Sequence, residues 1–291
     1  MRVSGLLITA LFAAVCCRAI AQVSVEIKLD QEQYLPGETV RIAVRITNFS
    51  GQTLRLGETP DWLAISVESR DGFIVPKTGE IPVVGPFTLP SAHVATKRVE
   101  LTPYLDLSRP ARYSVIATVQ IPEWDQAFSS APVTFDIVEG AKLWEREFGV
   151  PTTNGPPEVR KYTLQQVNYL KQVKLYVRVT DASGAKVHRV LCLGPLASFG
   201  HPRPAVDKLS NLHVLFQSGA RSFLYCVVNP DGDLVKCETY DYAATRPRLM
   251  ASADGDVTVV GGVRRPARNA PAGAVTNAPG TNKIGRPTNG G

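Results

Sequence analysis

The clearest structural signal in the chain is Phe223-Leu224-Tyr225-Cys226-Val227-Val228-Asn229-Pro230-Asp231-Gly232-Asp233-Leu234-Val235-Lys236-Cys237. Two runs rich in β-branched and aromatic residues flank Asn-Pro-Asp-Gly, a pattern typical of antiparallel strands joined by a tight turn. Pro230 fits the second position of a type I turn, and Gly232 fits the left-handed position that follows. The stretch therefore predicts a β-hairpin in which Pro230 and Gly232 have structural roles.

This turn also predicts the register of the hairpin. It pairs Asn229 with Asp233, and an uninterrupted ladder then places Tyr225 opposite Cys237, with Cys226 on the other face. A two-residue turn at Asp231-Gly232 would instead place the two cysteines opposite each other. That turn would need a backbone N–H from Pro230, and proline has none. Side chains on opposite faces cannot be bridged. We therefore expect free, buried thiols.

The hairpin has an earlier counterpart in the chain. Leu175-Tyr176-x-x-Val179 reappears 49 positions later as Leu224-Tyr225-x-x-Val228, and Asn211-Leu212-x-Val214 is echoed by Asp256-Val257-x-Val259 after 45 positions. Short antiparallel strands at this period resemble β-propeller blades. Residues 158–263 hold about two such units, whereas a closed propeller needs about 4–8. We expect one small antiparallel β domain, or an oligomer that completes a propeller.

Residues 22–140 predict a β-sandwich. Val40, Ile42, Val44 and Ile46 alternate with less apolar residues, and similar runs suggest about seven strands at sandwich-like spacing. Residues 141–157 contain Gly and Pro breakers and are interpreted as a linker. Trp144 lies four positions before an aromatic residue there, so a single helical turn could fix the angle between domains. The alternative is an extended linker with one buried tryptophan.

Three motifs carry a family resemblance: Tyr34-x-Pro36-Gly37-Glu38-x-Val40, the corner at residues 105–113, and the closing run at residues 129–137. They resemble the Ig-like sandwiches of bacterial secreted proteins, of the macroglobulin and proteinase-inhibitor types. The resemblance implies that Tyr113 occupies a tyrosine corner, with its hydroxyl bonded back to the main chain. The predicted fold class is therefore all-β, an Ig-like sandwich followed by a domain similar to propeller blades.

The two ends of the chain predict where the protein acts. Arg2, an apolar run and Ala19-Ile20-Ala21 form a secretory signal over residues 1–21, so we expect a secreted or periplasmic protein. Removing Arg2 and Arg18 lowers the formal net charge from +6 to +4. Residues 264–291 carry five basic side chains and no acid, which leaves about −1 for residues 22–263. We expect a disordered basic tail that can contact an anionic envelope polymer, and no nucleic-acid partner for the body.

The sequence contains few candidates for catalytic chemistry. Asn229, Asp231 and Asp233 alternate like calcium ligands, but the bidentate acid that closes a calcium loop is missing, and a plain turn explains them. The four histidines have no metal-ligand spacing, and His188 is expected to be an exposed strand residue. No nucleophile elbow or phosphate loop is present in the sequence. We therefore expect no enzyme activity, cofactor or metal.

The remaining functional signal is a loop. Phe199, His201 and Arg203 lie among prolines and glycine, where binding loops are common, so we predict a candidate binding loop there. The favoured hypothesis is a non-catalytic binding or scaffolding protein of the cell envelope, with an unidentified protein or an envelope polysaccharide as its partner. One alternative is a protease inhibitor that uses residues 76–90. The other is a glycan-acting hydrolase that uses Asp231 or Asp254.

Overall fold

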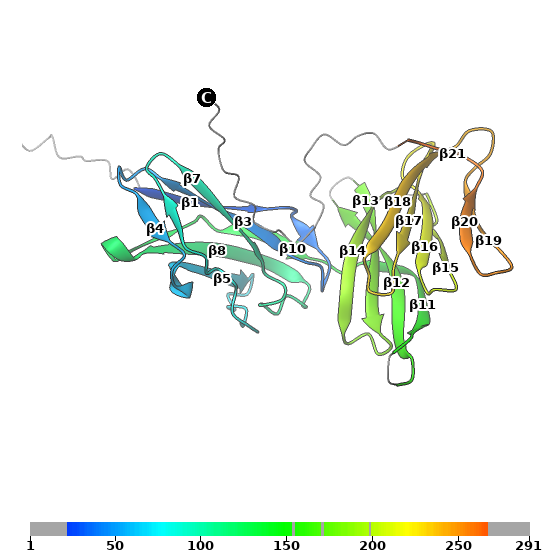
Figure 1. Cartoon of the computed structure of the whole chain (residues 1–291), viewed down its shortest axis with the longest axis horizontal. Coiled ribbons are helices and arrows are strands. Elements are labelled where there is room, and N and C mark those ends of the chain that lie inside the picture. Colours follow the sequence, from blue (N-terminus) through cyan, green and yellow to red (C-terminus); the bar gives the residue numbers. More distant parts are fainter. Residues whose placement is uncertain (1–21, 153–154, 170–171, 198, 267–291) are drawn as a thin grey trace, which may run out of the picture.

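The computed structural model describes residues 22–152, 155–169, 172–197 and 199–266, and these residues confirm the all-β prediction. They form several antiparallel sheets, and no sheet in this part of the chain closes into a barrel or propeller (Figure 1). The predicted signal peptide, residues 1–21, and most of the predicted basic tail, residues 267–291, lie outside the described residues.

The first domain consists of facing β-sheets. One sheet has the order β1 (Val23–Leu29), β3 (Arg41–Asn48), β7 (Val94–Glu100). The other has the order β2 (Gln33–Tyr34), β10 (Val133–Ile137), β8 (Ala111–Ile121), β5 (Leu63–Ser69), with β9 (Gln126–Ser129) also paired to β8. The remaining elements are β4 (Leu54–Leu56), β6 (Phe87–Leu89) and the short 3-10 helices η1 (Pro60–Trp62) and η2 (Pro122–Trp124).

The alternating sequence pattern explains this packing. Ile42, Val44 and Ile46 on β3 all point into the core and are fully buried, because successive side chains of a strand face opposite sides. The Tyr113 hydroxyl donates to the backbone carbonyl of Arg109 at 2.8 Å, which is the corner bond expected from the sequence. Trp62 is a core residue whose indole N–H donates to a backbone carbonyl.

The second domain contains two antiparallel meanders. The first has the order β11 (Ala141–Val150), β12 (Glu158–Tyr169), β13 (Gln172–Asp181), β14 (Val187–Leu196). The second has the order β15 (Arg203–Val206), β16 (Leu212–Gln217), β17 (Ser222–Val228), β18 (Leu234–Asp241), β21 (Val263–Arg264). A separate ribbon pairs β19 (Arg248–Ala251) with β20 (Val257–Val260). Apolar residues from both meanders form one core between them.

The ribbon β19–β20 is the first half of a third unit. Arg203 pairs with Leu215 in β15–β16, and Arg248 pairs with Val260 in β19–β20. Each residue of the second pair lies 45 positions after its counterpart in the first, so the two ribbons have the same register. Their turns also lie together, because the Lys208 N–H donates to the Gly255 carbonyl at 3.2 Å. The repeat seen in the sequence therefore has a structural counterpart. The repeated Leu-Tyr-x-x-Val motif lies in β13 and in β17, each of which is the third strand of its meander.

Of the two alternatives for the linker, the helical turn is wrong and the extended conformation is the one seen. Residues 141–150 form strand β11, and Trp144 pairs with Leu164 of β12, next to a bulge. Trp144 packs against the core of the second domain and does not fix the angle between the domains. The linker residues 141–150 thus belong to the first meander, because the strand covers an edge that β12 would otherwise leave open.

The predicted register of the β17–β18 hairpin is also wrong, although its turn is as expected. Gly232 has φ +87°, and the Asn229 N–H donates to the Asp233 carbonyl at 3.0 Å. A β-bulge then follows, because Val228 pairs with Leu234 but Cys226 pairs with Cys237. The extra residue shifts the ladder by one position, which brings the two cysteines to the same face. Both thiols are free, and only Cys226 of the two is buried.

The start of the predicted tail is ordered. Arg264 closes β21, and its guanidinium lies 2.7 Å from Glu238 Oε1. The Arg265 Nε donates to Asp241 Oδ2 at 3.0 Å. The expectation of a disordered tail from residue 264 is therefore wrong for these two arginines, which are paired with acids of β18.

The two domains share a small apolar cluster. Leu35 of the first domain is 2% exposed and packs with Tyr176 and Val190 of the second. It belongs to the Tyr34–Glu38 turn that carries the sandwich resemblance. Gly37 of the same turn comes so close to Val187 that a Cβ would lie 2.9 Å from a methyl carbon. The turn thus joins the domains as well as connecting two strands.

Candidate binding site

A cleft of about 1110 Å³ opens where the first strands of the three units meet. Trp144 of β11, Arg203 of β15 and Arg248 of β19 all line it, together with the loop that runs from Tyr242 to β19. The first strand of each unit thus contributes a side chain to the cleft, and Arg203 and Arg248 are equivalent residues of the repeat. The cleft is larger than the roughly 300–1,000 Å³ typical of small-molecule sites.

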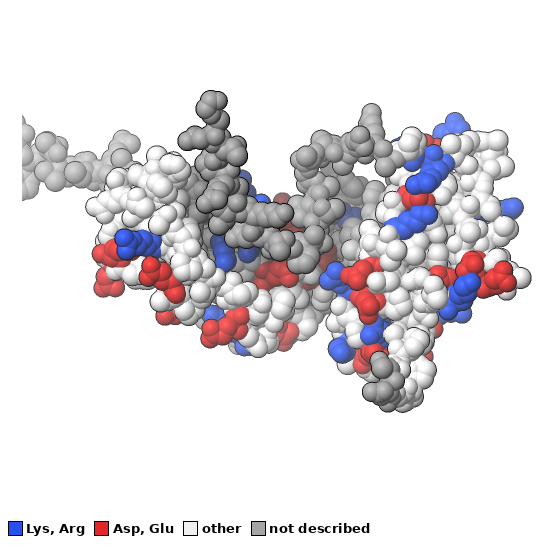
Figure 2. Space-filling view, in the orientation of Figure 1, with Lys and Arg blue, Asp and Glu red and all other residues white. Residues whose placement is uncertain are grey.

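The charge of the cleft is one-sided. Arg203, Arg246 and Arg248 are exposed and line it, and none of the described residues that line it is acidic. Elsewhere on the second domain the charges are mixed, and Figure 2 shows Lys and Arg side chains beside Asp and Glu side chains on the face in view. The cleft is therefore a local concentration of positive charge on a body whose formal net charge is about −1.

One arginine is held in place. Buried Gln217 donates from Nε2 to the carbonyls of Gly219 and Ala220, at 2.9 Å and 3.1 Å. These bonds orient the amide so that its oxygen accepts from Arg246 at 3.3 Å. The guanidinium also lies over the Phe223 ring, 5.0 Å from its centre. Arg246 is thus positioned at the cleft by a hydrogen bond and a cation–π contact.

The loop that carries Arg246 is tied to the end of the ribbon. The Gly262 N–H donates to the Thr245 carbonyl at 3.1 Å. Gly261 has φ +75°, and a Cβ there would lie 2.8 Å from the Arg246 carbonyl oxygen. Only glycine fits at this contact, because both the conformation and the space exclude a side chain. The Gly261-Gly262 pair therefore fixes one wall of the cleft.

The predicted binding loop contributes to this cleft in part. His201 and Arg203 line it, whereas Phe199 is 71% exposed and is not among the lining residues. The sequence did not indicate that Arg246, Arg248, Trp144 and Tyr242 also line the cleft. One signal was available: Pro202-Arg203 recurs as Pro247-Arg248 at the 45-residue offset, so the repeat places an arginine at the start of both strands.

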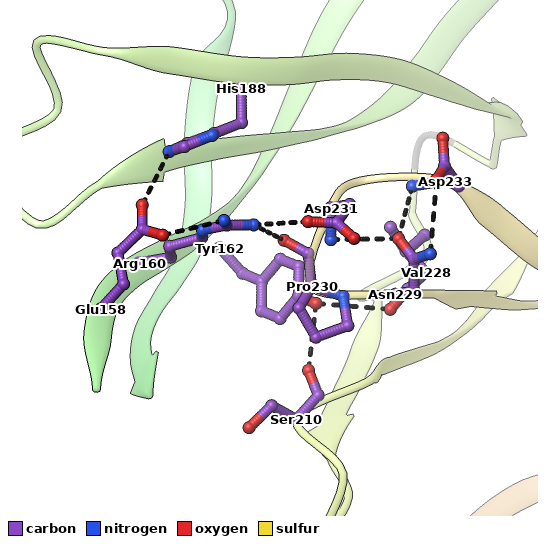
Figure 3. Close-up of polar contacts among 10 residues, drawn as sticks. All are labelled: Glu158, Arg160, Tyr162, His188, Ser210, Val228, Asn229, Pro230, Asp231 and Asp233. Carbon is purple, nitrogen blue, oxygen red and sulfur yellow. Dashed lines mark hydrogen bonds and ion pairs between the residues drawn. The ribbon is translucent and has the colours of Figure 1, made fainter. Parts of the chain in front are cut away.

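A second polar cluster joins the two meanders of the domain (Figure 3). Arg160 of β12 donates to the Pro230 carbonyl at 3.0 Å and to Asp231 Oδ1 at 2.7 Å, which fixes the β17–β18 turn against the first meander. It also donates to Glu158 Oε2 at 2.9 Å, and this hydrogen bond raises the pKa of Arg160 and lowers that of Glu158. The cluster is a structural clamp, since its acids are already paired.

The cluster also corrects the expectation for His188. Its side chain is only 13% exposed, and its Nε2 lies 3.6 Å from Glu158 Oε1. In the same region the Tyr162 hydroxyl donates to the Ser210 carbonyl at 3.0 Å, and burial raises the pKa of this tyrosine (Figure 3). Buried polar groups at this junction are thus used to hold the two sheets together.

The acids considered for hydrolysis lie apart in the fold. Asp231 is in the β17–β18 turn and is paired with Arg160, whereas Asp254 is in the β19–β20 turn. Asn229 Oδ1 accepts the backbone N–H groups of Asp231 and Asp233, which is turn bonding. Across the described residues, no cluster of three or more His, Cys, Asp or Glu side chains is arranged to hold a metal ion.

Comparisons with known proteins add little to this geometry. No protein-family model matches the chain, and no curated protein matches it in sequence. Among solved structures, the crystal structure of Spo0M, a sporulation control protein from Bacillus subtilis, is 13% identical with a TM-score of 0.30. That match covers 55% of this chain and 80% of that chain, and it supports no conclusion about fold or function. No helix in the described ranges is long and apolar enough to cross a membrane.

Proposed function

We propose that the protein is a non-catalytic binding protein of the cell envelope, secreted or periplasmic, whose cleft holds an acidic polysaccharide. The observation that carries the proposal is the cleft with three exposed arginines and no acidic lining residue. A guanidinium presents donors in a planar fork that matches a carboxylate, so it binds a uronate group better than a lysine would.

The aromatic residues of the cleft support a ring-bearing ligand. Trp144 is half-buried and Tyr242 is exposed, and both line the cleft. Flat apolar faces next to fixed donors suit sugar rings, which present an apolar face and a rim of hydroxyl groups. A cleft of about 1110 Å³ has room for several sugar units of an extended chain.

The architecture fits a binding role under the same proposal. We regard the first domain as a relative of the macroglobulin- and inhibitor-type sandwiches, and the second as an open array of propeller-like units. The proposed site lies where the first strands of the units converge, and its specificity would come from side chains and loops and not from the fold. Further contact of the basic tail with the same polymer is part of this proposal.

The test is calorimetric titration of the full chain with three polymers. Polygalacturonate carries carboxylates, pullulan is neutral, and a single-stranded oligonucleotide carries phosphates. We expect binding of polygalacturonate that persists at about 0.15 M salt, where charges beyond about 8 Å are screened. Equal binding of the oligonucleotide would contradict the proposal, because charge alone would then explain the affinity.

Two further arms separate the alternatives. A variant that ends at residue 266 removes the tail, and it should retain binding to polygalacturonate if the cleft is the site. A protease panel tests the inhibitor hypothesis, in which residues 76–90 are offered to a protease. Inhibition by the protein without polysaccharide binding would favour that second function. Release of reducing ends from polygalacturonate would instead favour a hydrolase.

A further inference from the structure

We propose that Cys226 and Cys237 form an oxidisable dithiol that closes to a cross-strand disulfide. The two residues are direct partners in the β17–β18 ladder, and their Sγ atoms lie 3.0 Å apart. Directly opposed residues of an antiparallel ladder have Cα atoms about 4.5–5.5 Å apart, within the roughly 4.4–6.8 Å that disulfides span. Closure therefore needs side-chain movement and no rearrangement of the strands.

The β-bulge of this hairpin creates the pair. With an uninterrupted ladder, Cys226 would face Lys236 and the two thiols would lie on opposite sides of the sheet. The extra residue instead pairs Val227 with Lys236, and the next pair is the two cysteines. A bulge within a few residues of a turn is a specific feature of a hairpin, and here it makes a bond between the thiols possible.

The two thiols have different surroundings. Cys226 is 0% exposed in the core between the meanders, whereas Cys237 is exposed. Strand β21 pairs only with Tyr240 and Asp241 of β18, so it leaves Cys237 uncovered. A hydrogen bond from the Cys226 thiol lowers the pKa of Cys237, while that contact and burial raise the pKa of Cys226. Cys237 is therefore the thiol that meets an oxidant first.

The reaction requires an oxidant of the small-molecule disulfide class, such as oxidised glutathione. The Cys237 thiolate attacks one sulfur of the oxidant, forms a mixed disulfide and releases one thiolate. Cys226 then loses its proton to solvent, and its sulfur attacks Cys237 Sγ and releases the second small thiol. The protein loses two electrons and two protons, and the oxidant leaves as two thiols.

The experiment uses the reduced full chain, treated with oxidised glutathione, alkylated under denaturing conditions and digested with trypsin. Cleavage after Arg221, Lys236 and Arg248 puts the two cysteines in separate peptides, 222–236 and 237–248. We expect these peptides joined by a disulfide that reduction separates. Recovery of both peptides singly alkylated, or a link from either one to Cys192, would overturn the proposal.

Single substitutions test the order of the two steps. Cys226→Ser removes the resolving thiol, so Cys237 should accumulate as a stable glutathione adduct. Cys237→Ser leaves a buried thiol, which should react at least ~10-fold more slowly with oxidised glutathione in the native state. Equal reactivity of Cys226 and Cys237 in these variants would contradict the assigned roles.

Cys192 provides the matched control. It lies on β14 but packs into the cluster around Leu35, on the other side of its sheet from the core that holds Cys226. Cys192→Ser should therefore leave the cross-link between the two tryptic peptides unchanged. Loss of the cross-link in a folded Cys192→Ser protein would show that another thiol pairing had been captured.

Discussion

Arg160 joins the two meanders through several hydrogen bonds made by one side chain. Its side chain is 12% exposed, and it bonds to a carbonyl and a carboxylate of the β17–β18 turn as well as to Glu158. Arg189 of β14 reaches the same turn through Asp233, but there both side chains are about half exposed. Both ion pairs connect the first meander to the β17–β18 turn, but only the Arg160 side chain is largely buried.

Arg160→Met should lower the free energy of unfolding by about 1–3 kcal/mol, because it removes charge-assisted hydrogen bonds made by a largely buried guanidinium. Arg189→Gln should cost only about 0–1 kcal/mol, as is usual for an exposed pair. Urea unfolding of both variants measures the difference. Equal losses would show that the clamp at Arg160 contributes no more than a surface contact.

Asp207 makes stability depend on pH. Burial by itself raises its pKa, but hydrogen bonds from Asn211 and His213 outweigh it and hold the pKa below its usual value. The group therefore adds stability above its unfolded pKa of about 4, and this stability is lost as pH falls through the lower folded pKa. Below pH 4, the urea midpoint should fall more steeply for the unaltered protein than for Asp207→Asn, and parallel curves would contradict this.

Among the elements, the β17–β18 hairpin shows what its sequence could and could not predict. Its turn follows from Asn229 to Gly232, because proline and glycine restrict the backbone there. No residue pattern indicates the bulge, because it adds one residue to a run in which every side chain suits a strand. Its position depends on how β18 packs in the sheet. Local chemistry therefore predicted the turn but not the register.

The same contrast applies to the cleft. Arg203 could be found from its proline-rich loop, and Arg248 from its place in the repeat. The bond between Gln217 and Arg246 joins residues 29 positions apart and exists only because the ribbon packs beside the second meander. Contacts of this kind depend on the packing of units, so no local pattern indicates them.

Turn glycines in equivalent positions give a test of this packing. Gly232 and Gly184 both have φ above +79°, but a Cβ at Gly232 would lie 2.4 Å from Arg189 Cβ, whereas nothing lies near Gly184. Gly184→Ala should cost about 1–2 kcal/mol for the backbone conformation alone. Gly232→Ala should cost clearly more in thermal or urea unfolding, and similar costs would contradict the close contact between the turn and β14.

In the whole molecule, the two domains are linked through the turn that contains Leu35. Leu35→Ala should lower the free energy of unfolding by about 2–5 kcal/mol and loosen the contact between domains. Small-angle scattering should then show a larger radius of gyration. Leu54→Ala, an equal truncation in the core of the first domain, should leave that radius unchanged. An unchanged radius in both variants would mean that the shared cluster does not hold the domains together.

The polysaccharide cleft is tested most directly by the dissociation constant for polygalacturonate of a triple variant, Arg203→Gln, Arg246→Gln and Arg248→Gln. Its matched control removes three exposed arginines of the first domain, Arg45, Arg55 and Arg98. We predict at least ~10-fold weaker binding for the cleft variant, since one charge-assisted hydrogen bond of about 1.5 kcal/mol already gives that factor. The control should bind like the unaltered protein. Equal weakening in both variants, or none in either, would contradict the proposal that this cleft binds the polymer.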